Sequence, residues 1–443
     1  MFFKNVLFTF SAEIIMVGIN AVVGILLARF LTVLDRGIMF LVMTLPILVY
    51  SFLDVGLSQA NIYMLKKKEY APRYVLGNSL AYCLVVGLVA TIGLWLLRIP
   101  VQELVLKGMP KEAYIWMVLL VPVLLLSRML LSFLRAYDRF DLFNLQRLLE
   151  GILLLTGISV IFFGFHGGLT QVIALYFGVM TTTLLFALVS LMITIPVELG
   201  FNGGMLKESF LYGSKIYAHN MLGFLNYRLS MYLLAIYLSP VEVAYYSLAA
   251  SLGEMVWYIP DSVGLVLFPR LTAVEDAEIG PLTAKVGRFT MVFTALIGIG
   301  LLSTGWLLIP LVYGADYQAS VIPLIVLMPG IMAMGLYKVL IRYFTAKDRQ
   351  QWMVLAAVIG VAVTAIAIFV LLPLWGTNGA AAATAFGYAV MTLVLSFKFI
   401  GETSLNWRDM LLPKLAEVKQ QFGVLKDMIV RFRMRKSAEK GAL

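Results

Sequence analysis

Ionisable side chains lie inside long apolar segments of this 443-residue chain, where a charge is costly and usually faces water or a partner. The cations are concentrated in the third of the predicted interior nearest the basic loops. Arg and Lys bind phosphate and pyrophosphate through charge-assisted hydrogen bonds, so this concentration predicts a site for a diphosphate anion. Its expected ligands, in descending order, are Arg228, Lys215, Arg128 and Lys338, with Asn226 on the same helix stripe as Lys215.

These cations also allow a simpler interpretation. Arg128, Lys215 and Lys338 are near enough to the predicted cytoplasmic ends of their segments for their charged groups to snorkel to the interface. Arg228 has no easy route by which its side chain could reach the interface, so we expect it to face a cavity. His219 is expected to be a hydrogen-bonded core histidine, with proton coupling as the alternative.

Four carboxylates occupy the same kind of segment: Glu13, Asp54, Glu254 and Asp261. Helical spacing places each of them on a polar stripe. We interpret Glu254, Glu13 and Asp54 as candidates for ion coupling, and a structural ion pair with a neighbouring cation is the alternative. Asp54 and Asp261 are expected either to pair with cavity cations or to orient backbone near the cytoplasmic mouth.

The composition identifies the elements that must position these groups. The chain is 61% hydrophobic and 13% charged, whereas a soluble domain has about 25% charged residues. Apolar stretches of membrane-spanning length recur throughout, which predicts an all-α integral membrane protein. We expect a retained first helix instead of a signal peptide, and twelve spans at about 5–30, 37–64, 73–97, 112–135, 142–164, 170–194, 207–238, 241–269, 285–309, 318–344, 351–373 and 377–399. Spans 3, 6, 11 and 12 carry no charge in their middles and are expected to face lipid.

Nothing in the sequence predicts catalysis. It contains no metal, nucleotide or nucleophile motif, so no catalytic residue, metal or cofactor is expected. The longest outer connection, 98–111, is too short to hold a catalytic domain. The single cysteine, Cys83, excludes a disulfide within the chain.

Basic residues set the predicted orientation. One set of connections holds fourteen Lys and Arg and the opposite set five, so the first set should face the cytoplasm, together with both termini. The tail at 400–443 contains "RFRMRK" at 431–436 and is expected to be a basic amphipathic helix on anionic lipid headgroups. Nucleic-acid binding is not expected.

A weak internal repeat appears when the sequence is shifted by 207 residues. "LLARFLTVLDRG" at 26–37 then aligns with "LLAIYLSPVEVA" at 233–244, and Asp54 falls on Asp261. The repeat unit is six helices, so the two halves should share one orientation. The predicted organisation is an N-lobe at 1–194, a cytoplasmic linker at 195–206 and a C-lobe at 207–399 around a central cavity.

Several stretches resemble a known family. "FLDVGLSQA", "LRAYDRFDLFNL" and "LAIYLSPVEVAYYSLAASLGEMVWYIPDSVGLVLFPRLT" are similar to the polysaccharide-transporter branch of the multidrug/oligosaccharidyl-lipid/polysaccharide exporter superfamily, the O-antigen-type lipid-linked oligosaccharide flippases. The resemblance covers nearly the whole chain. It implies two six-helix lobes, an alternately open cavity, and translocation of undecaprenyl-diphosphate-linked oligosaccharide across the bacterial plasma membrane for surface polysaccharide synthesis.

The resemblance also implies that basic cavity residues take the diphosphate while the lipid tail stays outside. Many relatives carry an aspartate where "NYRLSMYLL" has Ser230, which weakens any role transferred to that position. A polysaccharide polymerase or the chain-length machinery is a candidate protein partner. The main alternative is an ion-coupled multidrug or cation exporter, which would need a more acidic cavity. A membrane-bound polymerase or ligase would need a larger outer loop, and a lipid II flippase usually has two more helices.

Overall fold

The computed structural model describes residues 2–67, 70–195, 198–403 and 405–412, except the side chains of 2–10, 215–216 and 218–220. Within these residues the chain is helical and contains no strand. The predicted linker at 195–206 is described in part. The predicted tail at 400–443 is described only as far as residue 412, so its basic run at 431–436 lies outside the described residues.

The first half of the chain forms the helices that carry the first six predicted spans. A short 3₁₀ turn, η1, precedes α6, and a π-helical turn, η2, follows α7. The elements are α1 (Phe2–Phe30), α2 (Val33–Asp54), α3 (Leu57–Lys67), α4 (Pro72–Leu96), α5 (Arg98–Leu104), η1 (Lys111–Ala113), α6 (Tyr114–Ala136), α7 (Phe140–Ser159), η2 (Val160–Phe165) and α8 (Leu169–Thr194).

The second half repeats this plan with longer helices and ends in a short surface helix. Its elements are α9 (Gly203–Tyr237), α10 (Pro240–Glu254), η3 (Met255–Trp257), α11 (Tyr258–Leu271), α12 (Asp276–Tyr313), η4 (Ala315–Ser320), α13 (Val321–Ala346), α14 (Gln350–Glu402) and α15 (Trp407–Leu411).

Nine helical stretches of the described residues are long and apolar enough to cross a membrane. One of them, α14, covers two predicted spans and reverses at Gly376, which has φ 56° and ψ −132°. Gly379, after the reversal, packs directly against the backbone of Leu371, before it. A Cβ added to Gly379 would lie 2.0 Å from the Leu371 carbonyl oxygen. The predicted all-α membrane fold is confirmed. The count of twelve crossings stays a prediction, because α9 is more polar and the α10–α11 segment is interrupted.

The structure corrects two predicted spans, 37–64 and 241–269, which are broken instead of continuous. The first is interrupted at Val55 and Gly56, both of which have positive φ. The second is interrupted by the 3₁₀ turn η3, after which Pro260 lies in the first turn of α11, where its missing N–H is tolerated. Two broken spans in corresponding positions of the two halves are typical of transporter binding regions.

Helix boundaries support the internal repeat. The ends of α1 and α9 are 207 residues apart, and so are the starts of α2 and α10 and the starts of α6 and α13. The helix α13 is three residues longer than its counterpart α6, so the turns that follow these two helices are 210 residues apart. Asp138 and Asp348 occupy these turns with φ 58° and 54°, each followed by an arginine whose N–H donates across 2.8 Å to the last helical turn.

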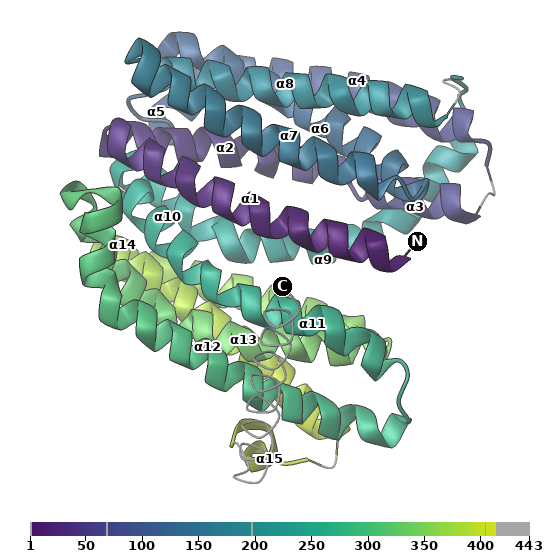
Figure 1. Cartoon of the computed structure of the whole chain (residues 1–443), viewed down its shortest axis with the longest axis vertical. Helices are drawn as coiled ribbons and strands as arrows, with labels where there is room; N and C mark the ends of the chain where they lie inside the picture. Colours follow the sequence, from purple (N-terminus) through teal and green to yellow (C-terminus); the bar gives the residue numbers. More distant parts are fainter. Residues whose placement is uncertain (1, 68–69, 196–197, 404, 413–443) are drawn as a thin grey trace, which may run out of the picture. The chain divides into compact units, whose positions relative to one another are not determined.

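The packing divides the chain into two compact units. The first contains Met1–Gly253, Leu301–Met328 and Ala357–Gly387, and the second contains Glu254–Gly300, Pro329–Ala356 and the described residues from Tyr388 onward. In the first unit, α4, α6, α7 and α8 lie side by side, and α1 packs along α7 (Figure 1). The predicted two-lobe boundary stays a prediction.

The spans predicted to face lipid present apolar side chains on the surface. Leu88 and Val89 on α4 are 60% and 66% exposed, and Ile366 on α14 is 67% exposed. Such apolar faces suit the hydrocarbon interior of a bilayer, which leaves the more polar helices to carry the candidate site.

Candidate functional site

The break between α2 and α3 explains the carboxylate of Asp54. Its Oδ1 accepts hydrogen bonds from the Ser58 backbone N–H at 3.2 Å and the Ser58 hydroxyl at 2.6 Å. It thereby satisfies one of the N–H groups that the first turn of α3 leaves open. These contacts are consistent with the predicted role of Asp54 in orienting backbone, which stays a prediction.

Arg128 on α6 lies beside this break. Its side chain is exposed, and its guanidinium carbon is 5.6 Å from the centre of the Tyr50 ring. Asp54 and Glu150 both lie within its electrostatic reach. The arrangement leaves an accessible guanidinium held against an aromatic face, which suits recognition of a planar or phosphorylated anion.

A second charged group joins α1 to α7. Arg147 donates from Nη2 to Glu13 Oε2 at 2.8 Å, and Glu150 lies near enough for Arg147 to attract its carboxylate. The sequence prediction counted Arg147 among the fourteen basic residues of the cytoplasmic connections, although it falls within the predicted span 142–164, and did not consider Glu150. The helix begins at Phe140, so Arg147 is about 10 Å inside it. Arg147 and Glu150 are one turn apart on one face of a helix, and this spacing could have identified them from the sequence as a second charged group.

The polar stripe of α9 packs against α14. The Asn226 amide donates to the Leu222 carbonyl at 2.9 Å and to the Ala357 carbonyl at 3.1 Å, and its Oδ1 is buried without a partner in the described residues. Ser230 forms a hydrogen bond with Thr384. Both side chains are therefore in protein contacts. Lys215 and His219, on the same helix, lie outside the described side chains.

Arg228 occupies a different face of α9. Tyr232, one turn further on, donates from its hydroxyl to the Thr44 carbonyl of α2 at 2.9 Å and lies within the electrostatic reach of Arg228. This contact places the Arg228 face toward α2, within the first unit. Arg228 is half-buried there.

In the second unit, Lys338 on α13 is neutralised by Asp261 on α11. The ammonium nitrogen lies 2.9 Å from both carboxylate oxygens and 5.0 Å from the centre of the Trp257 ring. The Trp257 indole donates to the Ile331 carbonyl at 2.9 Å, which fixes the ring. Asp261 therefore forms an ion pair with Lys338, and its role toward a cavity stays a prediction. Glu254 ends α10 directly before this cluster.

Outside the spans, Arg139 forms two hydrogen bonds of 3.0 Å to the Asp141 carboxylate, which raise the pKa of Arg139. Among the described residues, no three His, Cys, Asp or Glu side chains are arranged to hold a metal ion. The predicted residues thus form local charge groups: Asp54 near Arg128, Glu13 with Arg147, and Asp261 with Lys338.

Comparisons with solved structures identify the fold. A lipid II flippase MurJ in an inward closed conformation is 15% identical, with a TM-score of 0.78 over 95% of this chain and 93% of that chain. An inward-facing multidrug resistance MATE family transporter of the MOP superfamily is 15% identical, with a TM-score of 0.73 over 87% and 94% of the two chains. A MOP superfamily transporter from Pyrococcus furiosus is 13% identical, with a TM-score of 0.57 over 90% and 94%.

No curated protein sequence matches the chain. The structural neighbours are transporters and flippases, not enzymes, and the several apolar helices make this a multi-pass membrane protein. A family model described as a polysaccharide biosynthesis protein matches residues 26–322. This match covers more than half of the sequence, and the chain belongs to the polysaccharide biosynthesis protein family.

Proposed function

We propose that the chain translocates undecaprenyl-diphosphate-linked oligosaccharide units across the bacterial plasma membrane by alternating access, for O-antigen, capsule or exopolysaccharide synthesis. The observation that carries this proposal is the presence of two arginines within helices predicted to span the membrane, Arg128 on α6 and Arg228 on α9, in a protein of the polysaccharide biosynthesis family. A guanidinium group can donate two parallel hydrogen bonds to the oxygens of a diphosphate, and a low-dielectric setting strengthens that interaction.

The surroundings of the predicted ligands support a revised order among them. Arg128 is exposed beside Tyr50, whereas the charge of Lys338 is already balanced by Asp261. Arg228 and Arg128 are therefore the principal proposed ligands of the diphosphate, and Lys338 contributes once its pair with Asp261 opens. Lys215 keeps its predicted role, and Asn226 supports the helix that carries Arg228. A polysaccharide polymerase or the chain-length machinery remains the proposed protein partner.

Complementation tests the substrate class. Cells that lack a polysaccharide-unit flippase should regain surface polysaccharide with the wild-type chain and lose it with Arg128→Ala or Arg228→Ala. Variants with lysine in place of either arginine should restore surface polysaccharide only in part, because an ammonium group cannot reproduce the bidentate geometry. Arg98→Ala is the matched control, since Arg98 also stacks on an aromatic ring, that of Trp95, but at the end of a span.

The alternative is an ion-coupled multidrug or cation exporter, since a multidrug resistance MATE family transporter has the same fold. Resistance of the same cells to cationic drugs would support this alternative if polysaccharide is not restored. A flippase background with a different sugar unit separates a wrong sugar from a wrong substrate class.

The proposed orientation, with both termini in the cytoplasm, has its own test. In a Cys83→Ser background, Glu112→Cys should react with an impermeant maleimide added outside intact cells, and Glu275→Cys should react only after lysis. The reverse pattern would overturn the orientation. Both native positions are exposed, so the protein itself does not block either reaction.

A further inference from the structure

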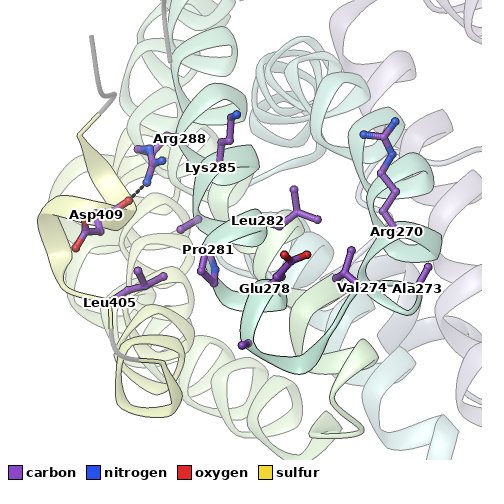
Figure 2. A pocket seen from close by; sticks show the side chains of 12 residues that line it. Arg270, Ala273, Val274, Glu278, Pro281, Leu282, Lys285, Arg288, Leu405 and Asp409 are labelled. Carbon is purple, nitrogen blue, oxygen red and sulfur yellow. Dashed lines mark hydrogen bonds between the residues drawn. The ribbon is translucent and has the colours of Figure 1, made fainter. Parts of the chain in front are cut away.

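The second compact unit contains a cavity of about 650 Å³ where α11, α12 and α15 meet. Figure 2 shows Arg270 reaching it from α11 and Lys285 and Arg288 from α12, with Leu405 on the opposite wall. None of these residues was assigned to the candidate site. The cavity lies at the connection between α11 and α12, which the charge distribution places on the cytoplasmic side.

The three cations of this cavity have different tasks. Arg288 is only 4% exposed and donates to the backbone carbonyl of Asp409, so it holds α15 against α12. Arg270 is exposed and Lys285 half-buried, and neither forms an ion pair within the described part of the chain. Two cations are thus available to a ligand, beside a third that builds the wall.

The remaining wall is partly acidic and partly apolar. Glu278 lies in the cavity and opposes an anion, and Asp409 contributes a second carboxylate, so three cations face two carboxylates. Val274, Leu282 and Leu405 line the rest. A cavity with a small positive excess and an apolar wall suits an amphiphilic anion better than a fully hydrated one.

The position of α15 points to the membrane surface. Its Met410 is fully buried, and the Trp407 ring packs on Phe397 at 4.8 Å between ring centroids. Leu412, just beyond it, is 59% exposed. A short docked helix with an aromatic side chain and exposed leucines beside basic residues is typical of the headgroup region of a bilayer.

We propose that this cavity binds a phosphate ester anion, supplied by the headgroup of an anionic phospholipid, with Arg270 and Lys285 on the phosphate and Leu282 and Leu405 against the apolar part of the lipid. The bound lipid would fasten α15 to α12 at the membrane surface. This site lies outside the proposed diphosphate ligands, so it stands or falls independently of the proposed function. The same phosphate chemistry could be met by free phosphate, which the test separates.

The test is native mass spectrometry of the full-length protein in detergent, titrated with dioleoyl phosphatidylglycerol or dioleoyl phosphatidylcholine. The wild type should retain the anionic lipid preferentially, and the double variant Arg270→Gln, Lys285→Gln should bind it roughly tenfold or more weakly. Glu278→Gln should tighten binding, because it removes the opposing carboxylate. Glycerol phosphate and inorganic phosphate, added as competitors, reveal whether a free phosphate suffices.

Arg408→Gln is the matched control, since Arg408 is exposed on α15 and does not line the cavity. Equal binding by the wild type and the double variant would overturn the proposal, as would an equal loss in Arg408→Gln. Competition by free phosphate without any lipid preference would keep the anion site and reject the lipid as its source. The charge-preserving variant Arg270→Lys, Lys285→Arg should still bind, and it separates loss of charge from loss of folding.

Discussion

Gly56 and Gly213 lie in direct backbone contact. A Cβ on Gly56 would stand 2.2 Å from the Gly213 carbonyl oxygen, and a Cβ on Gly213 would stand 2.7 Å from the Gly56 oxygen. The contact lets the break between α2 and α3 pack closely against the first third of α9, where Tyr63 and Tyr212 stack with ring centroids 4.0 Å apart. Small residues allow helices to approach this closely within a membrane.

Gly56→Ala is expected to destabilise the protein by about 2 kcal/mol or more for two reasons. Alanine would be held in a left-handed backbone conformation that it disfavours, and its Cβ would clash with Gly213. Gly56 has φ 77°. The apparent melting temperature in detergent should fall accordingly. Gly178→Ala on α8 is the control, since nothing lies within 4 Å of its added Cβ and helix propensity favours alanine. Equal melting temperatures for the two variants would contradict the prediction.

Asp54→Ala is expected to cost about 1 kcal/mol, the usual effect of losing a side chain that accepts from the first turn of a helix. Asp54→Asn keeps an oxygen that can accept from Ser58, so its stability should stay close to the wild type. Thermal unfolding of the two variants provides the measurement. If asparagine is as damaging as alanine, the negative charge matters more than the hydrogen bonds.

Much of the fold could be predicted from the sequence because membrane helices are set by length and hydropathy. The sequence predicted separate spans at 351–373 and 377–399, and the structure places the reversal of α14 between them, at Gly376. The breaks at Val55–Gly56 and at Met255–Trp257 could not be predicted, since the apolar pattern continues through them. They depend on contacts with other helices, as in the hydrogen bond from the Trp257 indole of η3 to the Ile331 backbone carbonyl of α13.

The candidate site was predicted less completely. The sequence identified Asp54 and Asp261 as unusual and left open whether each pairs with a cation or orients backbone. In the structure, Asp54 accepts hydrogen bonds from Ser58 and Asp261 pairs with Lys338, while their predicted functional roles stay predictions. Arg147 was missed although it lies inside the predicted span 142–164, which begins at Phe140 in the structure, because it was counted with the basic residues of the neighbouring connection and not as a charge within a helix.

Glu13→Gln is expected to change stability by less than about 1 kcal/mol, because its pair with Arg147 is partly solvated. The side chains of Glu13 and Arg147 are 50% and 31% exposed. Transport of the lipid-linked sugar should nevertheless fall if Glu13 takes part in ion coupling. Surface polysaccharide, scored at matched expression, measures this. Normal polysaccharide in Glu13→Gln would leave the pair with a structural role alone.

Lys338→Met is expected to destabilise the protein by about 1–3 kcal/mol, between the values for an exposed and a buried ion pair. The Lys338 side chain is 14% exposed and that of Asp261 47% exposed. The variant also loses the cation–π contact with Trp257. Lys347→Met is the matched control, since Lys347 pairs with Asp276, which is 82% exposed, and its loss should cost under about 1 kcal/mol.

The charge swap Lys338→Asp with Asp261→Lys separates the pair from the substrate. It should recover more than half of the stability lost in Lys338→Met, because the two charges can still meet across α11 and α13. If Lys338 also binds the diphosphate, the swapped protein should be stable but should fail to restore surface polysaccharide, since the cation then sits on the wrong helix. Full restoration by the swap would limit Lys338 to the ion pair and leave anion binding to the arginines of the first unit.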